Sequence, residues 1–185
     1  MEQYEFEGRL YRKNGAKWVD ASGMSAPLAI SKKLDALAFS ALDLSAMDWA
    51  EARTEGDRYK EAENYAYAIR FFERAMEAAE NERQISVILP RLTSCYRKHH
   101  HPENVIKLMH EVKSIYGARI LNEALLTSAA AAYCDMEKPK EALQCCRYAY
   151  AMAKEDHPNA PPGLELTNVW ERAKRMAGEE DLEDF

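Results

Sequence analysis

The chain has 185 residues, of which 47% are hydrophobic, 30% charged and 10% aromatic, and it contains only 7 Gly and 7 Pro. This composition is typical of a folded globular protein and excludes a collagen-like, intrinsically disordered or disulfide-dominated chain. A chain of this length should bury roughly 70% of its unfolded surface, so one compact unit can be stable without covalent cross-links.

The net charge of −6 comes mainly from the C-terminal end. The chain has 25 Lys and Arg against 31 Asp and Glu. Residues 178–185 form an acidic tail that contains Glu179, Glu180, Asp181, Glu183 and Asp184. Without this tail the chain is nearly neutral, so the general electrostatic footprint of a duplex-binding protein is absent.

No sequence segment predicts export or membrane insertion. Residues 1–10 contain acids and no apolar core, unlike a signal peptide, and no run approaches the ~20 apolar residues of a membrane span. The four cysteines lack Cys-x-x-Cys spacing, so we expect reduced and mostly buried thiols. They are Cys95, Cys134, Cys145 and Cys146, with Cys145 the one candidate for exposure. We therefore expect a cytoplasmic protein.

Residues 1–24 predict a β-hairpin. Two short aromatic-rich runs, residues 4–13 and 16–20, flank Asn14-Gly15, the dipeptide best suited to a type I′ turn. Because two strands alone are marginally stable in water, their apolar side chains must rest on a helix or on a partner. Trp18 and Tyr11 are therefore an alternative partner-binding surface.

From residue 25 the apolar spacing is helical almost to the end of the chain. Ser25 and Pro27 suit a helix start. Residues 45–48 resemble a capping box, which opens a short helix that Gly56 closes. The predicted fold class is therefore all-α in the main, with an N-terminal hairpin.

Two helical segments repeat at an interval of 37 residues, which indicates a repeat architecture. Leu89, Tyr96, Pro102, Val105, Met109 and Val112 are in register with Leu126, Tyr133, Pro139, Ala142, Cys146 and Ala149. Each copy is a pair of helices joined by a polar turn, with Pro at the start of the second helix. The clear copies cover about residues 86–119 and 123–156. A degenerate copy, whose first helix has lost the pattern, covers about residues 49–82.

This spacing resembles the tetratricopeptide repeat, in which small residues let paired helices approach. The chain departs from the family pattern in its period of 37 rather than 34, and no glycine stands at the small position. Gly117 and Lys154 replace the usual closing proline. The resemblance implies a tetratricopeptide-like α-α superhelix of about seven helices over residues 25–177. Pro158, Pro161 and Pro162 precede its capping helix at about residues 163–177.

In the resembled family, the first helix of each repeat lines a concave groove that binds a peptide or partner protein. The resemblance implies a protein-binding adaptor or accessory subunit of bacterial type, without a cofactor, and leaves a homo-oligomer open. The implied groove residues are Val87, Pro90, Arg91, Ser94, Arg97, Lys98, Ala124, Thr127, Ser128, Ala131 and Asp135. Residues 91–119 contain six basic and two acidic residues, so we expect Arg91 and Arg97 to meet an acidic group.

Two alternatives stay open. Arg91, Arg97, Lys98 and the histidines would suit an accessory subunit of a nucleic-acid-processing or defence complex that contacts RNA or DNA. His99, His100 and His101 would be the ligands of a metal-binding protein or enzyme. Zinc ligands are normally divided between separate elements, so we interpret the three histidines as a solvated turn. The sequence has no nucleophile elbow, phosphate loop or His-Glu-x-x-His motif, so we expect no enzymatic activity.

Overall fold

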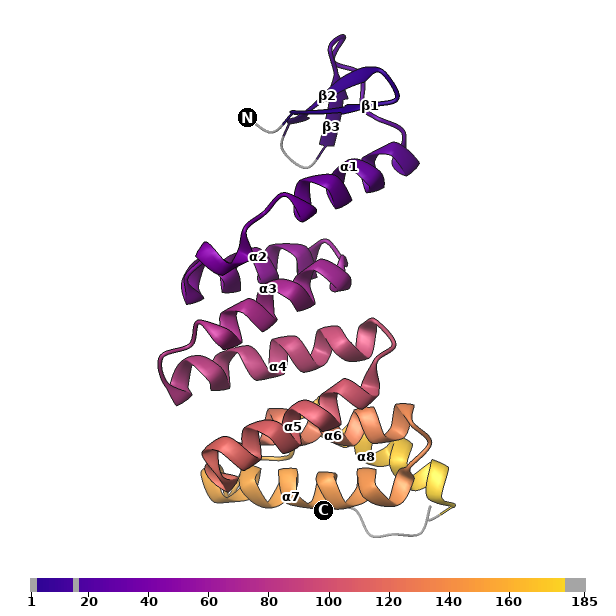
Figure 1. Ribbon diagram of the computed structural model, residues 1–185. Helices are drawn as coiled ribbons and strands as arrows, with labels where there is room; N and C mark the ends of the chain where they lie inside the picture. Colours follow the sequence, from indigo (N-terminus) through magenta and orange to yellow (C-terminus); the bar gives the residue numbers. More distant parts are fainter. Residues whose placement is uncertain (1–2, 15–16, 179–185) are drawn as a thin grey trace. The chain divides into compact units, whose positions relative to one another are not determined.

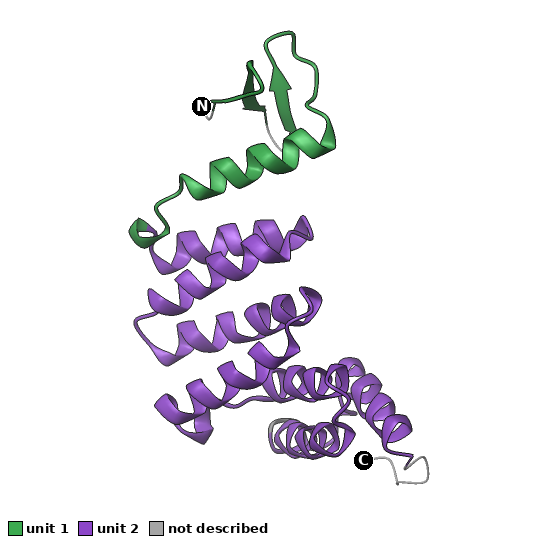
Figure 2. Ribbon diagram, turned by 45° about the vertical axis from the view of Figure 1, so that its right-hand side comes forward, with its two compact units in different colours: residues 1–46 green, residues 47–185 purple. Residues whose placement is uncertain are grey.

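The computed structural model describes residues 3–14 and 17–178. Within them are a three-stranded antiparallel sheet and eight α-helices (Figure 1), which confirms a mainly helical fold with N-terminal strands. The chain divides into two compact units, unit 1 over residues 1–46 and unit 2 over residues 47–185 (Figure 2). This division differs from the boundary expected after residue 24, because the first helix shares a core with the sheet.

Unit 1 is a small sheet packed on one helix. Strands β1 (Gln3–Phe6), β2 (Arg9–Asn14) and β3 (Lys17–Asp20) pair in that order, and helix α1 spans Leu28–Ser40, followed by a short 3-10 turn, η1 (Leu44–Ala46). The first aromatic-rich run is two strands rather than one, because Glu7 and Gly8 both have positive φ and turn the chain. Asn14 pairs with Lys17, whereas Gly15 of the expected type I′ turn lies outside the described residues.

The aromatic residues of the strands form the core of unit 1. Strand alternation turns Tyr11 and Trp18 toward α1, where both are buried with Leu34. Trp18 Nε1 donates a hydrogen bond of 2.9 Å to Asp35 Oδ1 on α1, and Lys13 pairs with the same carboxylate. Trp18 and Tyr11 are therefore core residues, and the alternative partner surface expected at these rings is not exposed.

Unit 2 is built from paired helices. In chain order they are α2 (Trp49–Glu61), α3 (Tyr65–Glu77), α4 (Glu82–Lys98), α5 (Pro102–Tyr116), α6 (Glu123–Asp135), α7 (Pro139–Asp156) and α8 (Leu164–Ala177). A short 3-10 turn, η2 (Ala118–Ile120), joins α5 to the loop before α6. We call α2, α4, α6 and α8 the A helices and α3, α5 and α7 the B helices. Each A helix contacts the next one along the chain, so α2, α4, α6 and α8 form one continuous layer.

Three turns between A and B helices share one backbone geometry at intervals of 37 residues. Glu63, His100 and Glu137 each adopt a left-handed conformation, with φ of 56°, 62° and 58°. One residue later, the amide donates a 2.9 Å hydrogen bond to the carbonyl of Tyr59, Tyr96 or Tyr133. This is the Schellman pattern of a helix C-terminus. The copy at residues 49–82 therefore has the same helix–turn–helix backbone as the two clear copies.

Gly56 does not close a helix, contrary to the sequence-based expectation. The N-cap of α2 is Asp48, whose side chain accepts from the Glu51 amide in a complete capping box, and the helix continues through Gly56 to Glu61. A Cβ atom on Gly56 would lie 2.5 Å from Cε1 of Phe72 on α3. Gly56 is thus the small residue at which α2 and α3 approach closely, so the expectation that no glycine stands at the small position is wrong for this pair of helices.

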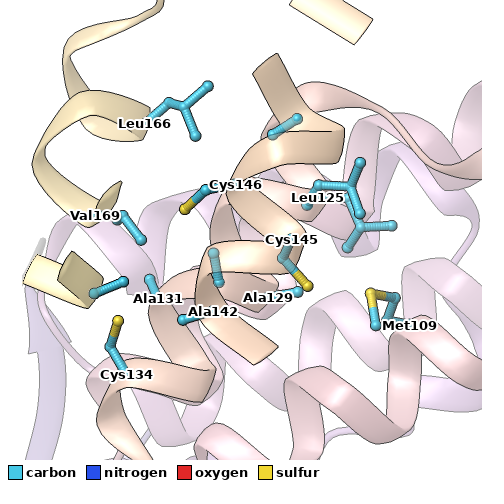
Figure 3. Close-up of a cluster of buried hydrophobic side chains, with 14 of the residues drawn as sticks. Met109, Leu125, Ala129, Ala131, Cys134, Ala142, Cys145, Cys146, Leu166 and Val169 are labelled. Carbon is cyan, nitrogen blue, oxygen red and sulfur yellow. The ribbon is translucent and has the colours of Figure 1, made fainter. Parts of the chain in front are cut away.

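The largest core of unit 2 lies between α4, α5, α6, α7 and α8, and Figure 3 shows part of it. All four cysteines are free and buried, which confirms the expected thiols, although Cys145 is only 9% exposed and so is not a surface residue. Burial raises the pKa of Cys145 to about 11 and that of Cys146 to about 12. These thiols therefore act as small apolar side chains.

Candidate functional site on the A helices

Ion pairs join successive A helices along one face, which we call the A-helix face. Arg91 of α4 pairs with Asp57 of α2, with 2.9 Å between Nε and Oδ1. Arg97 of α4 pairs with Asp135 of α6 at 3.0 Å, and Arg172 of α8 pairs with the other oxygen of Asp135 at 2.6 Å. The three pairs link all four A helices.

Arg97 and Arg172 together border a hollow in the A-helix face. Its volume is about 750 Å³, and it is lined by Ser94, Arg97, Lys98, His100, Pro102, Glu103, Asp135, Glu165 and Arg172. The side chains of Arg97 and Asp135 are 24% and 27% exposed, so their charges are partly shielded from water but accessible. Because one carboxylate serves two guanidinium groups, Arg97, Arg172 and Asp135 together carry a formal charge of +1. Over the whole lining, however, three acidic side chains balance three basic ones.

A smaller hollow of about 500 Å³ adjoins the first and shares three of its residues. It is lined by Arg97, Leu164, Glu165, Asn168, Val169 and Arg172. Leu164 is an exposed large apolar side chain. The A-helix face therefore places an apolar contact surface beside the two arginines.

Four of the predicted groove residues lie together at the larger hollow. Arg97, Asp135, Ser94 and Lys98 line the larger hollow, and the Lys98 ammonium group also lies 5.5 Å from the centre of the Tyr65 ring. Arg91 lies away from the hollow, where it is held by Asp57 and by the Val87 carbonyl. The two predicted arginines are therefore brought to one face but into different ion pairs.

The predicted groove residues of α6 are mostly buried. Thr127, Ser128 and Ala131 are covered in the structure, because α6 is packed by α4, α5, α7 and α8 at once. Among the predicted residues of α6, Asp135, at the C-terminal end, reaches the hollow. Ala124 is exposed near the other end of the helix. Thr127 and Ser128 are thus core positions in the folded chain.

The three histidines occupy one of the repeated turns. His99 is the C-cap of α4, His100 has the left-handed φ, and His101 precedes Pro102 at the start of α5. The rings of His99 and His101 lie 5.1 Å apart, and His101 Nδ1 lies 3.3 Å from Glu103 Oε1. In the part of the chain that the structure describes, no three His, Cys, Asp or Glu side chains are grouped to hold a metal ion.

Sequence reasoning missed Asp57, Glu165 and Arg172. The signal for Arg172 was available, since a further step of 37 residues from Asp135 leads to it, as one from Lys98 leads to Asp135. The register thus extends into α8, a helix that the sequence-based prediction treated only as a cap. Asp57 gave no such signal, because its equivalent position in α4 is Ser94.

Comparison with models of protein families found no match for this chain. Comparison with curated proteins also found none. Among residues 3–14 and 17–178, no helix combines the length and apolar character that crossing a lipid bilayer requires. A function for this chain must therefore be inferred from the chemistry of the site itself.

Proposed function

We propose that this chain is a tetratricopeptide-like protein-binding module, an adaptor or accessory subunit, that takes a peptide segment of a partner on its A-helix face. The observation that carries the proposal is the convergence of Arg97 and Arg172 on the single carboxylate of Asp135 beside a hollow of about 750 Å³. Charge-assisted hydrogen bonds to a second carboxylate would use the remaining donors of the two arginines.

The family resemblance is supported by the degenerate copy at about residues 49–82. Gly56 and Tyr59 stand at the Gly-x-x-Tyr positions of the tetratricopeptide pattern, and Ala68 and Phe72 stand at its Ala-x3-Phe positions. The close approach of Gly56 to Phe72 gives the small residue the role it has in the resembled family. The resemblance implies that a face formed by successive helices binds a peptide.

The side chains beside the two arginines restrict the charge and the apolar character that we expect of the ligand. Glu103 and Glu165 also line the hollow, so a polyanion such as RNA would meet carboxylates on both sides. One acidic side chain or terminus avoids this repulsion. Leu164 and Val169 offer an apolar contact next to Arg97 and Arg172. We therefore expect a peptide in which one acidic group lies beside an apolar residue.

The test uses the full chain and a displayed library of random peptides. Peptides selected by the wild type are expected to carry an acidic group next to an apolar residue. Replacing Arg97 and Arg172 with Gln should weaken their binding at least tenfold in fluorescence anisotropy, about 1.4 kcal/mol. The matched control changes Lys107 and Lys140 to Gln, because both are exposed on B helices. Selected peptides that respond equally to both double variants would contradict the proposal.

A further inference from the structure

A third cavity of unit 2 lies between two B helices and shares no lining residue with the two hollows of the A-helix face. It has a volume of about 650 Å³ and is bordered by α5, α6 and α7. Met109, Leu126 and Cys145 form a buried apolar floor. Figure 3 shows Met109 and Cys145 pointing toward one another from α5 and α7. We call this cavity the B-helix groove.

The preceding copy of the repeat shows what normally fills this position. The residue 37 positions before Cys145 is Leu108, which packs against both core clusters of unit 2. Likewise, the equivalent of Tyr133 is Tyr96, whose hydroxyl donates a 2.8 Å hydrogen bond to Glu73. The position of Glu73 corresponds to His110, which lines the groove beside Tyr133. A thiol on the repeated backbone thus stands where the preceding copy has an isobutyl group.

The α7 wall of the groove is a stripe along one side of the helix. Its members are Glu141, Gln144, Cys145, Tyr148, Ala151, Met152 and Glu155, spaced by three or four residues as one helix face requires. Glu141 and Glu155 are fourteen residues apart, about 21 Å along the helix axis. An acidic side chain therefore stands near each end of the groove, and Lys113 stands on the opposite wall.

We propose that the B-helix groove binds an amphipathic helix of a partner protein. An extended peptide would lay its backbone amides and carbonyls on the apolar floor without partners, which is costly, whereas a helix satisfies its own backbone. The length of the groove suits about four helical turns. Apolar anchors at i, i+4 and i+7 would fill the space above Cys145.

The charged side chains that line the groove determine the orientation of the partner helix. Basic residues near both of its ends pair with Glu141 and Glu155, and an acidic residue on its other flank faces Lys113. Because this groove and the A-helix face share no lining residue, the chain can hold two partners at once. This goes beyond peptide binding on the A helices and does not depend on it.

The experiment selects binders for the full chain from a displayed library of four-turn helices with varied anchors and flanks. The selected helices should be basic at both ends. Tyr148→Glu should weaken their binding at least tenfold, since Tyr148 is 58% exposed on the groove wall. Cys145→Leu should also abolish binding, without lowering the melting temperature, by filling the position as Leu108 does. The matched control is Ile115→Glu, because Ile115 is 71% exposed and does not line the groove.

Three results would overturn the proposal. The first is a selection whose binders do not distinguish Tyr148→Glu from Ile115→Glu. The second is a loss of binding in the Arg97 and Arg172 double variant, which would place the selected helices on the A-helix face. The third is a concentration-dependent dimer that Tyr148→Glu disrupts, because a second copy of the chain would then occupy the groove.

Discussion

At the scale of single residues, small side chains determine how closely the paired helices approach. Gly56 lets α2 contact the Phe72 ring, and Ala68 of α3 is fully buried in the same cluster. In the third pair, Ala130 and Ala142 occupy the equivalent positions and are also fully buried. A methyl group added at any of these positions would therefore alter the distance between two helix backbones and not the surface of the protein.

Gly56→Ala should lower the free energy of unfolding by about 1–2 kcal/mol. Overpacking typically costs 1–3 kcal/mol, and the new Cβ would lie 2.5 Å from Phe72, whereas the better helix propensity of Ala returns up to about 1 kcal/mol. The measurement is chemical denaturation. Gly163→Ala is the control, because its Cβ would meet only the end of the Glu123 side chain, at 3.3 Å. Equal effects of the two changes would contradict the close approach of α2 and α3.

The buried thiols make stability depend on alkaline pH. Burial raises the pKa of Cys95 and Cys145 to about 11 and that of Cys146 to about 12. In the unfolded chain these thiols ionise near pH 8.5, so the unfolded state releases protons first. Stability is therefore complete below about pH 8.5 and is lost as the pH rises toward 11 and 12.

We expect Cys95, Cys145 and Cys146 each to remove about 1–2 kcal/mol of stability by pH 10. Urea denaturation at pH 7 and at pH 10 measures the loss. In the Cys146→Ala variant, the free energies of unfolding at pH 7 and at pH 10 should differ by less than in the wild type. One titrating group is gone, whereas the tyrosines and lysines are unchanged. If the free energy of unfolding falls equally in this variant and in the wild type, Cys146 ionises equally in the folded and the unfolded chain.

At the scale of elements, the turn between A and B helices explains the three histidines. His100 holds the left-handed position that Glu63 and Glu137 hold in the other copies, and the His101 amide closes the helix on the Tyr96 carbonyl at 2.9 Å. The imidazoles of His99, His100 and His101 are exposed. The turn is therefore formed by its backbone conformation and hydrogen bonds, to which the imidazole side chains do not contribute.

Changing His99, His100 and His101 together to Asn should leave the melting temperature within about 2 °C of the wild type, with and without a chelator. Asn tolerates the left-handed conformation that position 100 requires, so the turn is preserved. Differential scanning calorimetry checks this. A wild type that is destabilised by the chelator, beside an insensitive variant, would identify the histidines as metal ligands instead.

At the scale of the whole molecule, the two units have separate cores. Tyr11, Trp18, Leu34 and Ala38 form the buried cluster of unit 1, and the other two clusters belong to unit 2. Each unit thus has its own source of hydrophobic stabilisation. Local unfolding of one core need not open the other.

Leu34→Ala should open unit 1 selectively. Leu34 is fully buried, and truncating a buried Leu costs about 2–5 kcal/mol, which is large for a unit of 46 residues. Hydrogen exchange measured by mass spectrometry should show lost protection in residues 3–46 and unchanged protection in residues 47–178. Ala36→Gly, at an exposed position of the same helix, is the milder control. Uniform loss of protection along the chain would mean that the two units unfold together.

Local sequence patterns predict most of the helices and their 37-residue register, although not the continuation of α2 beyond Gly56. Apolar periodicity, the proline starts at Pro102 and Pro139 and the 37-residue interval are local properties of the chain, and the structure has helices beginning at both prolines. The strands were also visible, although the turn at Glu7 was not, because a non-glycine residue with positive φ gives little sequence signal.

Which faces of those helices are covered depends on packing between segments that are distant in the chain. Thr127 and Ser128 looked like surface residues, yet they are buried, because four other helices pack around α6. The approach of Arg97 and Arg172 to Asp135 joins three helices, so helical spacing within any one helix could not predict it. Periodicity specifies where a side chain points on its own helix, whereas burial and pairing depend on neighbours distant in the chain.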